Sequence, residues 1–134
     1  MRIAEPSLLI RISRSWHEGI STQALFEATR GVWKIGERRE QVELVFAVAS
    51  GIVREVYRVH AWHPAGTTLY HTRVPVEVAI QGRWEFTGEL ADELLRSRYL
   101  GTDVSDFFSP GSSNPITVCQ CPDQPLIEPL SCGL

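Results

Sequence analysis

Residues 41–62, QVELVFAVASGIVREVYRVHAW, decide the fold of this 134-residue chain. In the first half, every second residue from position 42 to position 48 is apolar, which is typical of a β-strand. In the second half Val53, Tyr57 and Val59 recur, and we expect these three side chains to share one face of a second strand. Gly51 supplies the positive φ of a tight turn. The stretch therefore predicts a β-hairpin at the centre of a sheet.

Other elements are expected on both sides of this hairpin. A helix capped by Ser21 or Thr22 is expected to run to Gly31, because glycine is common at the C-terminal end of helices. In chain order, the remaining expected elements are a strand at 8–13, an edge strand at 74–80, a strand at 83–87 with Trp84 and Phe86 on one face, a short helix at 91–98, a helical turn at 103–108 and a closing strand at 116–119.

Five or six strands, an early helix and no βαβ alternation predict an α+β fold. We expect a small, mostly antiparallel pseudo-barrel with two or three short helices. A length of 134 residues suits a single domain, which we place at residues 1–121. The proline-containing tail, residues 122–134, is expected to be irregular and to add little stability because it has no periodic apolar face.

The composition, 43% hydrophobic and 22% charged, is that of an ordinary globular protein. No apolar run approaches the roughly 20 residues that span a bilayer, so we expect no membrane partner. Arg11 interrupts the short apolar run near the N-terminus, and no small-residue cleavage site follows it. An odd number of cysteines, three, argues against a closed disulfide framework and agrees with a reducing compartment. A cytoplasmic location is the default expectation.

Charge is distributed unevenly along the chain, whose net charge is −3. Residues 1–60 hold 9 Arg and Lys against 7 Asp and Glu, whereas residues 61–134 hold 4 against 9. Four cations, Arg30, Lys34, Arg38 and Arg39, fall within ten residues and are opposed only by Glu37. Such a local patch is able to contact phosphate, although a solvated helix end has the same appearance.

Metal binding is not expected. Cys119, Cys121 and Cys132 lack paired CxxC spacing, and no histidine lies near them in the sequence. His60 and His63 are spaced for two ligands, but no acidic third ligand stands out. We expect no cofactor, and the chain contains no GxSxG, P-loop or GxGxxG motif.

One segment resembles a known family. A helix ending at Gly31, then Lys34-x-x-Glu37-x-Arg39, then the strands of the hairpin, is similar to ASCH domains and their EVE relatives in the PUA-like superfamily. The resemblance covers roughly residues 21–62. The usual motif has glycine two residues before the lysine, whereas Gly31 lies three residues before Lys34.

The resemblance implies a PUA-like pseudo-barrel with a cleft that accepts RNA or a modified base. Lys34 and Arg39 would engage phosphate, and Glu37 would bond a base edge or orient Arg39. Trp33 or Trp62 would stack on a base, which contributes on the order of 1 to 3 kcal/mol. For both tryptophans, a place in the core is an equally good interpretation.

Two alternatives remain open. Some ASCH-like proteins are amidohydrolases that act on acylated nucleosides with a lysine, a threonine and a glutamate. Lys34 would correspond to that lysine, but Glu37 stands where those enzymes have threonine; Thr67 and Thr68 in the long loop would have to substitute. The other alternative is a protein-interaction module that docks a partner through a sheet edge or through Leu126, Ile127 and Leu130 of the tail.

Overall fold

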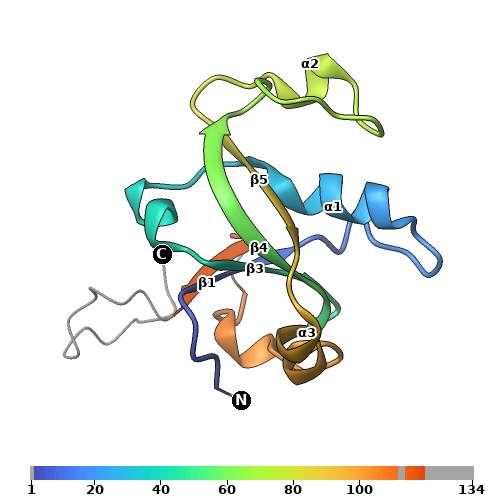
Figure 1. Cartoon of the computed structure of the whole chain (residues 1–134), viewed down its shortest axis with the longest axis vertical. Helices are drawn as coiled ribbons and strands as arrows, with labels where there is room; N and C mark the ends of the chain where they lie inside the picture. Colours follow the sequence, from blue (N-terminus) through green and yellow to red (C-terminus); the bar gives the residue numbers. More distant parts are fainter. Residues whose placement is uncertain (1, 112–113, 120–134) are drawn as a thin grey trace.

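The structure is a computed structural model that describes residues 2–111 and 114–119. It is a small α+β fold in which a mixed sheet curls into a half-barrel (Figure 1). The strands are β1 (Ser7–Arg11), β2 (Gly31–Trp33), β3 (Leu44–Ala49), β4 (Ile52–Pro64), β5 (Trp84–Leu90) and β6 (Ile116–Cys119). The helices are α1 (Thr22–Arg30), α2 (Pro75–Val78) and α3 (Glu93–Tyr99), with 3-10 helices η1 (Glu37–Gln41) and η2 (Ser105–Phe107).

The predicted hairpin is confirmed. β3 and β4 pair antiparallel, and Ser50 and Gly51 connect them with φ values of 55° and 76°. Two successive left-handed residues form the kind of turn whose twist matches that of the flanking strands. The strand order is β2-β5-β4-β3-β1-β6, so the hairpin occupies the centre of the sheet.

Alternation along β3 produces two hydrophobic cores, one on each face of the sheet. Leu44 and Phe46 pack with Tyr99 of α3, whereas Val45 and Ala47 belong to the cluster on the other face, which contains Leu25 and Phe26 of α1. All six residues of β3 are buried. Burial on both faces explains why this stretch is a nearly continuous hydrophobic run.

Two β-bulges bend β4, which is the long curved strand of Figure 1. Ala47 pairs with Glu55 but Val48 pairs with Val53, so one residue of β4 is skipped; a second shift follows Val59. A bulge bends its strand, increases the local twist and exchanges the faces beyond it. The expected shared face is therefore wrong. Val53 packs on the α3 side, and Tyr57 and Val59 pack on the α1 side.

The expected edge strand at residues 74–80 is also wrong, because this segment contains α2. Pro75 stands at the start of the helix, where its missing N–H costs nothing, and the Glu77 carboxylate accepts a hydrogen bond from the Val74 amide at 3.1 Å. Val76 is 83% exposed and has no strand to pair with among the described residues. Local capping therefore outweighs the alternating pattern.

The sheet contains one parallel pairing, between β1 and β3, and its other pairings are antiparallel. This arrangement corrects the expectation of no βαβ alternation, because α1 carries the chain across the sheet between β1 and β3. The other expected elements are present as strands β1, β5 and β6, helix α3 and the turn η2. The predicted tail, residues 122–134, lies outside the described residues.

Helix α1 begins and ends where the sequence predicts. The Ser21 hydroxyl accepts a hydrogen bond from the Ala24 amide at 3.1 Å, which satisfies one free N–H of the first turn. Gly31 ends the helix in an extended conformation and starts β2 directly. Within residues 2–111 and 114–119, no helix is long and apolar enough to span a bilayer.

Candidate functional site

A cleft of about 970 Å³ lies beside α1. One side is formed by the end of β1 and the following turn, and the other by the segment that leads into α2. Ala24 and Ala28 of α1 and the three residues of β2 line the space between these sides. This volume is at the upper end of the range of about 300–1,000 Å³ that is typical of small-molecule sites.

Trp33 lines this cleft from the end of β2. Its indole nitrogen donates a hydrogen bond to the Thr29 carbonyl oxygen at 2.7 Å, and the ring packs against the core on the α1 side. The hydrogen bond fixes the orientation of the ring. A half-buried, fixed aromatic ring on the wall of a cleft is suited to stacking on a planar ligand.

The charged side chains in the cleft lining are mostly cationic. Arg11, Arg14 and Arg73 face one carboxylate, that of Glu77, so the lining carries a formal charge of +3 − 1 = +2. The whole chain has a net charge of −3. The cleft is therefore positive in an acidic protein and favours an anionic ligand.

The wall opposite β1 is held in place by Glu27, which is fully buried in α1. Its carboxylate accepts hydrogen bonds from the amides of His71 and Thr72, from the Thr72 hydroxyl and from the Gln23 side chain. Arg73 adds hydrogen bonds to the carbonyl oxygens of Glu27 and Gly31. These contacts position Thr72 and Arg73 at the cleft.

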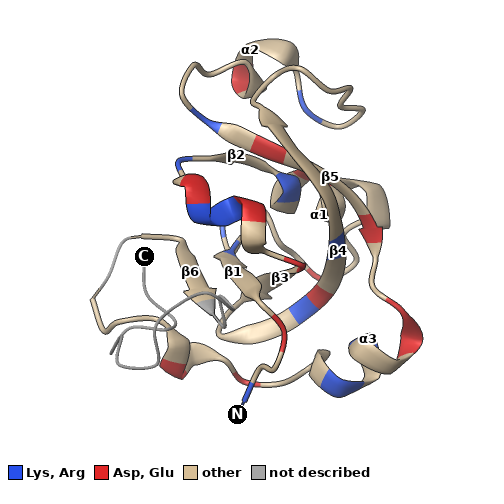
Figure 2. Ribbon diagram, turned by 60° about the vertical axis from the view of Figure 1, so that its left-hand side comes forward, with Lys and Arg blue, Asp and Glu red and all other residues tan. Residues whose placement is uncertain are grey.

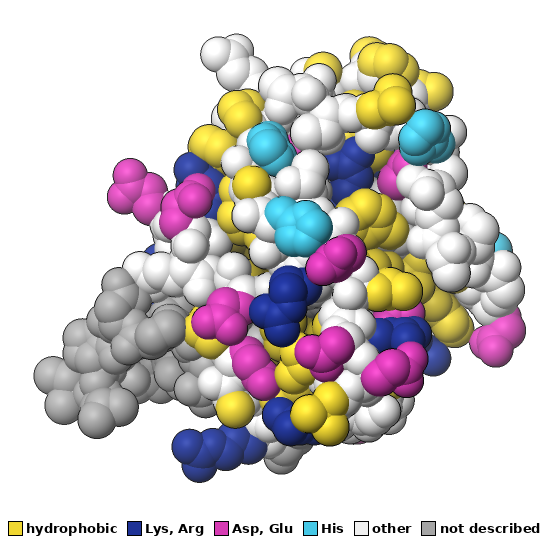
Figure 3. Space-filling model, in the orientation of Figure 1, with side chains coloured by type: hydrophobic (Ala, Val, Ile, Leu, Met, Phe, Trp, Pro, Cys, Tyr) yellow, Lys and Arg dark blue, Asp and Glu magenta, His cyan; other side chains and the backbone are white. Residues whose placement is uncertain are grey.

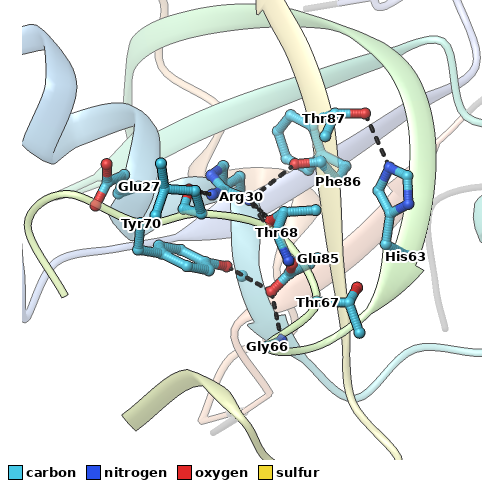
Figure 4. Close-up of polar contacts among 12 residues, drawn as sticks. Glu27, Arg30, His63, Gly66, Thr67, Thr68, Tyr70, Glu85, Phe86 and Thr87 are labelled. Carbon is cyan, nitrogen blue, oxygen red and sulfur yellow. Dashed lines mark hydrogen bonds and ion pairs between the residues drawn. The ribbon is translucent and has the colours of Figure 1, made fainter. Parts of the chain in front are cut away.

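A second buried carboxylate, Glu85 of β5, anchors the start of the segment between β4 and β5, which also contains Thr72 and Arg73 (Figure 4). It accepts hydrogen bonds from the amides of Gly66 and Thr68, from the Thr68 hydroxyl and from the Tyr70 hydroxyl. The Arg30 guanidinium lies 4.0 Å from the Glu85 carboxylate and donates a hydrogen bond to the Thr68 hydroxyl. It also stacks on Tyr70, 3.8 Å from the centroid of the ring. Two buried carboxylates thus anchor the long segment between β4 and β5.

Hydrogen bonding keeps both carboxylates ionised. Burial alone would raise the pKa of Glu27, but the hydrogen bonds from Thr72, His71 and Gln23 outweigh burial and lower the pKa to about 2. The pKa of Glu85 is lowered by bonds from Thr68, Gly66 and Tyr70, again against the effect of burial. For Tyr70, burial raises the pKa above its usual value, so its hydroxyl stays a donor to Glu85.

The five residues predicted from the sequence are not gathered in this cleft. Trp33 lines it, whereas its described lining does not include Lys34, Glu37, Arg39 or Trp62. Lys34 and Glu37 are exposed. Figure 2 shows η1, a short turn in which two adjacent basic residues lie between two acidic residues. That Lys34 and Glu37 contact a ligand stays a prediction.

Arg39 and Trp62 pack against aromatic residues of β5. The Arg39 guanidinium lies 3.4 Å from the centroid of the Trp84 ring, and its Nε is 3.2 Å from the Glu40 carboxylate. Trp62 contacts Phe86 with ring centroids 5.3 Å apart, because the second bulge turns its side chain inward. Both side chains therefore contribute to packing at this end of the half-barrel.

The threonines of the amidohydrolase alternative have partners elsewhere. The Thr67 hydroxyl donates to the Pro64 carbonyl oxygen at 2.7 Å, and the Thr68 hydroxyl belongs to the buried Glu85 network (Figure 4). His63 bonds the Thr87 hydroxyl at 3.0 Å, and His60 lies 3.5 Å from Glu89. Within the described part of the chain, no group of three or more histidine, cysteine or acidic residues is arranged to hold a metal ion.

Sequence reasoning missed Glu27, Arg73 and Glu85, the residues that shape the cleft wall. Glu85 lies between Trp84 and Phe86, where simple alternation points it away from their core. One signal was present for Glu27, a carboxylate flanked by Phe26 and Ala28 within the predicted helix. Its donors other than Gln23, however, lie 44 and 45 residues further along the chain.

No protein-family model, curated protein or solved structure matches this chain. A functional assignment therefore depends on the geometry of the cleft and on the chemistry of the side chains that line it.

Proposed function

We propose that this chain binds nucleic acid or a nucleoside in the cleft beside α1, with a base stacked on Trp33. The observation that carries the proposal is the fixed Trp33 ring on the wall of a cleft whose lining has a formal charge of +2. Proteins that bind single strands combine a positively charged groove with aromatic stacking platforms.

We also propose that the half-barrel is a PUA-like domain of the ASCH type. The helix ending at Gly31 and the Lys34-x-x-Glu37-x-Arg39 segment ahead of the hairpin support this assignment.

A binding experiment tests the proposal. The wild-type protein is titrated with short RNA, single-stranded DNA and a set of nucleosides, and the oligonucleotide titrations are repeated at increasing salt. We expect oligonucleotide affinity to fall steeply with salt, because counterions leave phosphate on binding. Trp33→Leu removes the stacking ring and should cost on the order of 1 to 3 kcal/mol of binding free energy, whereas Trp33→Phe keeps an aromatic face. Absence of binding to every member of the set contradicts the proposal.

The second candidate function is the docking of a protein partner, and one observation favours it. Exposed apolar side chains gather on the segment around α2, at the top of Figure 3. They are Leu69 (74% exposed), Val74, Val76 and Ile80. Docking through this surface would be almost indifferent to salt, so the salt titration separates the two functions.

A further inference from the structure

The two sides of the cleft differ in charge. Arg11 and Arg14 lie on the side formed by β1 and the turn after it, which contributes +2. On the opposite side Arg73 and Glu77 cancel, so that side contributes zero. The positive potential of the cleft therefore comes from the β1 side, which we call the positive end, and an anionic group is expected to bind there.

The side chains at the positive end are suited to phosphate. Arg11 is held by a hydrogen bond to the Asn114 carbonyl oxygen and lies 4.7 Å from the centroid of the Phe108 ring, so its position is restricted. Arg14 is exposed and makes no hydrogen bond or ion pair with any described residue. Ser13 and Ser15 line the same end of the cleft, and the Ser13 hydroxyl, which accepts a hydrogen bond from the Ser50 amide at 3.4 Å, can still donate its own proton. Two guanidinium groups and two hydroxyl donors match the acceptor oxygens of a phosphate group.

The other end, on the side of Arg73 and Glu77, is less favourable for an anion because its charges cancel. Arg73 already donates to two backbone carbonyl oxygens, those of Glu27 and Gly31. Glu77 lies in the same wall and would repel a phosphate group. This end is instead suited to a neutral group that both donates and accepts hydrogen bonds, such as the edge of a base.

We propose that the end of the cleft formed by Arg11, Ser13, Arg14 and Ser15 is a phosphate subsite, and that the ligand is a phosphorylated nucleoside rather than a free base or nucleoside. The inference rests on the proposed function, because it takes Trp33 as the base platform. The phosphate, as a mononucleotide or within a strand, then lies on the β1 side of Trp33 and the base edge faces Thr72 and Arg73.

The test compares matched ligands by calorimetry at constant low salt. Each of the four ribonucleosides is titrated beside its 5′- and 3′-monophosphates, with inorganic phosphate as a further ligand. We expect at least one monophosphate to bind roughly ten-fold or more tightly than its nucleoside, as charge-assisted hydrogen bonds to phosphate imply. Arg14→Ala should reduce this ratio several-fold, with Arg11 and the two serines left in place, and leave nucleoside affinity unchanged. Arg83→Ala removes an exposed arginine outside the cleft lining and should preserve the ratio.

The outcomes separate the subsite from the proposed function. If nucleosides and monophosphates bind equally well to the wild type, the subsite is wrong and the proposed function stands. If the ratio is high but Arg14→Ala keeps it, phosphate binds elsewhere and the subsite is again wrong. If no nucleoside, nucleotide or oligonucleotide binds, both proposals fail. Trp33→Leu should weaken nucleoside and monophosphate binding by the same factor, and a selective loss of the monophosphate would contradict the placement of the base on Trp33.

Discussion

The carboxylate of Glu27 accepts hydrogen bonds from both the backbone amide and the hydroxyl of Thr72, each at 2.7 Å, across 45 residues of sequence. One residue belongs to α1 and the other to the segment between β4 and β5. Because Thr72 and Arg73 line the cleft, this contact couples the stability of the segment to the shape of the proposed site.

Replacing Glu27 with Gln should release this segment. An amide keeps one acceptor oxygen and places an NH2 group where the other oxygen was, so the donors from His71, Thr72 and Gln23 face one acceptor oxygen instead of two. We expect a loss of roughly 1 to 3 kcal/mol in the free energy of unfolding and faster hydrogen exchange at the amides of His71 and Thr72. Gln23→Ala removes only one of the donors to Glu27 and serves as the control. Unchanged exchange at residues 71 and 72 in Glu27→Gln would contradict the role of Glu27.

The same contact predicts a dependence of stability on pH. The pKa of Glu27 is about 2 in the folded protein against an ordinary value of 4.5, so folding favours the ionised form. Its contribution is complete above pH 4.5 and is lost as the pH falls through about 2. The difference in unfolding free energy between wild type and Glu27→Gln should therefore shrink over that interval. Urea titrations at several pH values measure this difference. A difference that does not depend on pH would contradict the role of the ionised Glu27 carboxylate.

The hairpin was predictable because two apolar runs joined by Ser50 and Gly51 form a local pattern, and β3 is apolar on both faces because both are buried. The bulges of β4 were not, since a bulge is a property of pairing register that depends on the partner strand. They change which face Val53 and Trp62 occupy. The helix α2 was missed because the alternation of residues 74–80 favoured a strand, whereas Pro75 and Glu77 together cap a short helix.

The candidate site was predicted only in part for a related reason. Trp33 follows the predicted helix end, and the structure places it at the cleft. The cations of the lining come from Arg11, Arg14 and Arg73, which are far apart in sequence and do not form a basic cluster along the chain. Arg39 belonged to such a cluster, but the position of Trp84 after folding gives its guanidinium a stacking partner.

Gly31 is expected to tolerate no side chain. A Cβ at this position would lie 2.3 Å from the Tyr70 hydroxyl and 3.0 Å from the Glu85 Cβ. Tyr70 would have to move, and its 2.9 Å hydrogen bond to Glu85 would break. Gly31→Ala should cost roughly 1 to 3 kcal/mol of stability in denaturant titrations.

The control for this change is Gly36→Ala. Gly36 has a φ of −83°, and a Cβ there would have nothing within 4 Å. Its stability should stay within about 0.5 kcal/mol of wild type. Equal effects of the two substitutions would show that the space beside Tyr70 is not what excludes a side chain.

Lys34 and Arg39, which the sequence groups in one phosphate-binding motif, should behave differently when each is replaced with Ala. Arg39 is stacked 3.4 Å from the Trp84 centroid and is 11% exposed, so Arg39→Ala should lose packing and lower the free energy of unfolding by roughly 0.5 to 2 kcal/mol. Lys34 is exposed, so Lys34→Ala should leave stability nearly unchanged. If Lys34 contacts phosphate, its loss weakens oligonucleotide binding across sequences and reduces the slope of log affinity against log salt by about one.

Denaturant and salt titrations of both variants measure these effects. A stable Arg39→Ala protein with a reduced salt slope would place Arg39 at the ligand instead, and an unchanged slope in Lys34→Ala would exclude Lys34 from the phosphate contacts.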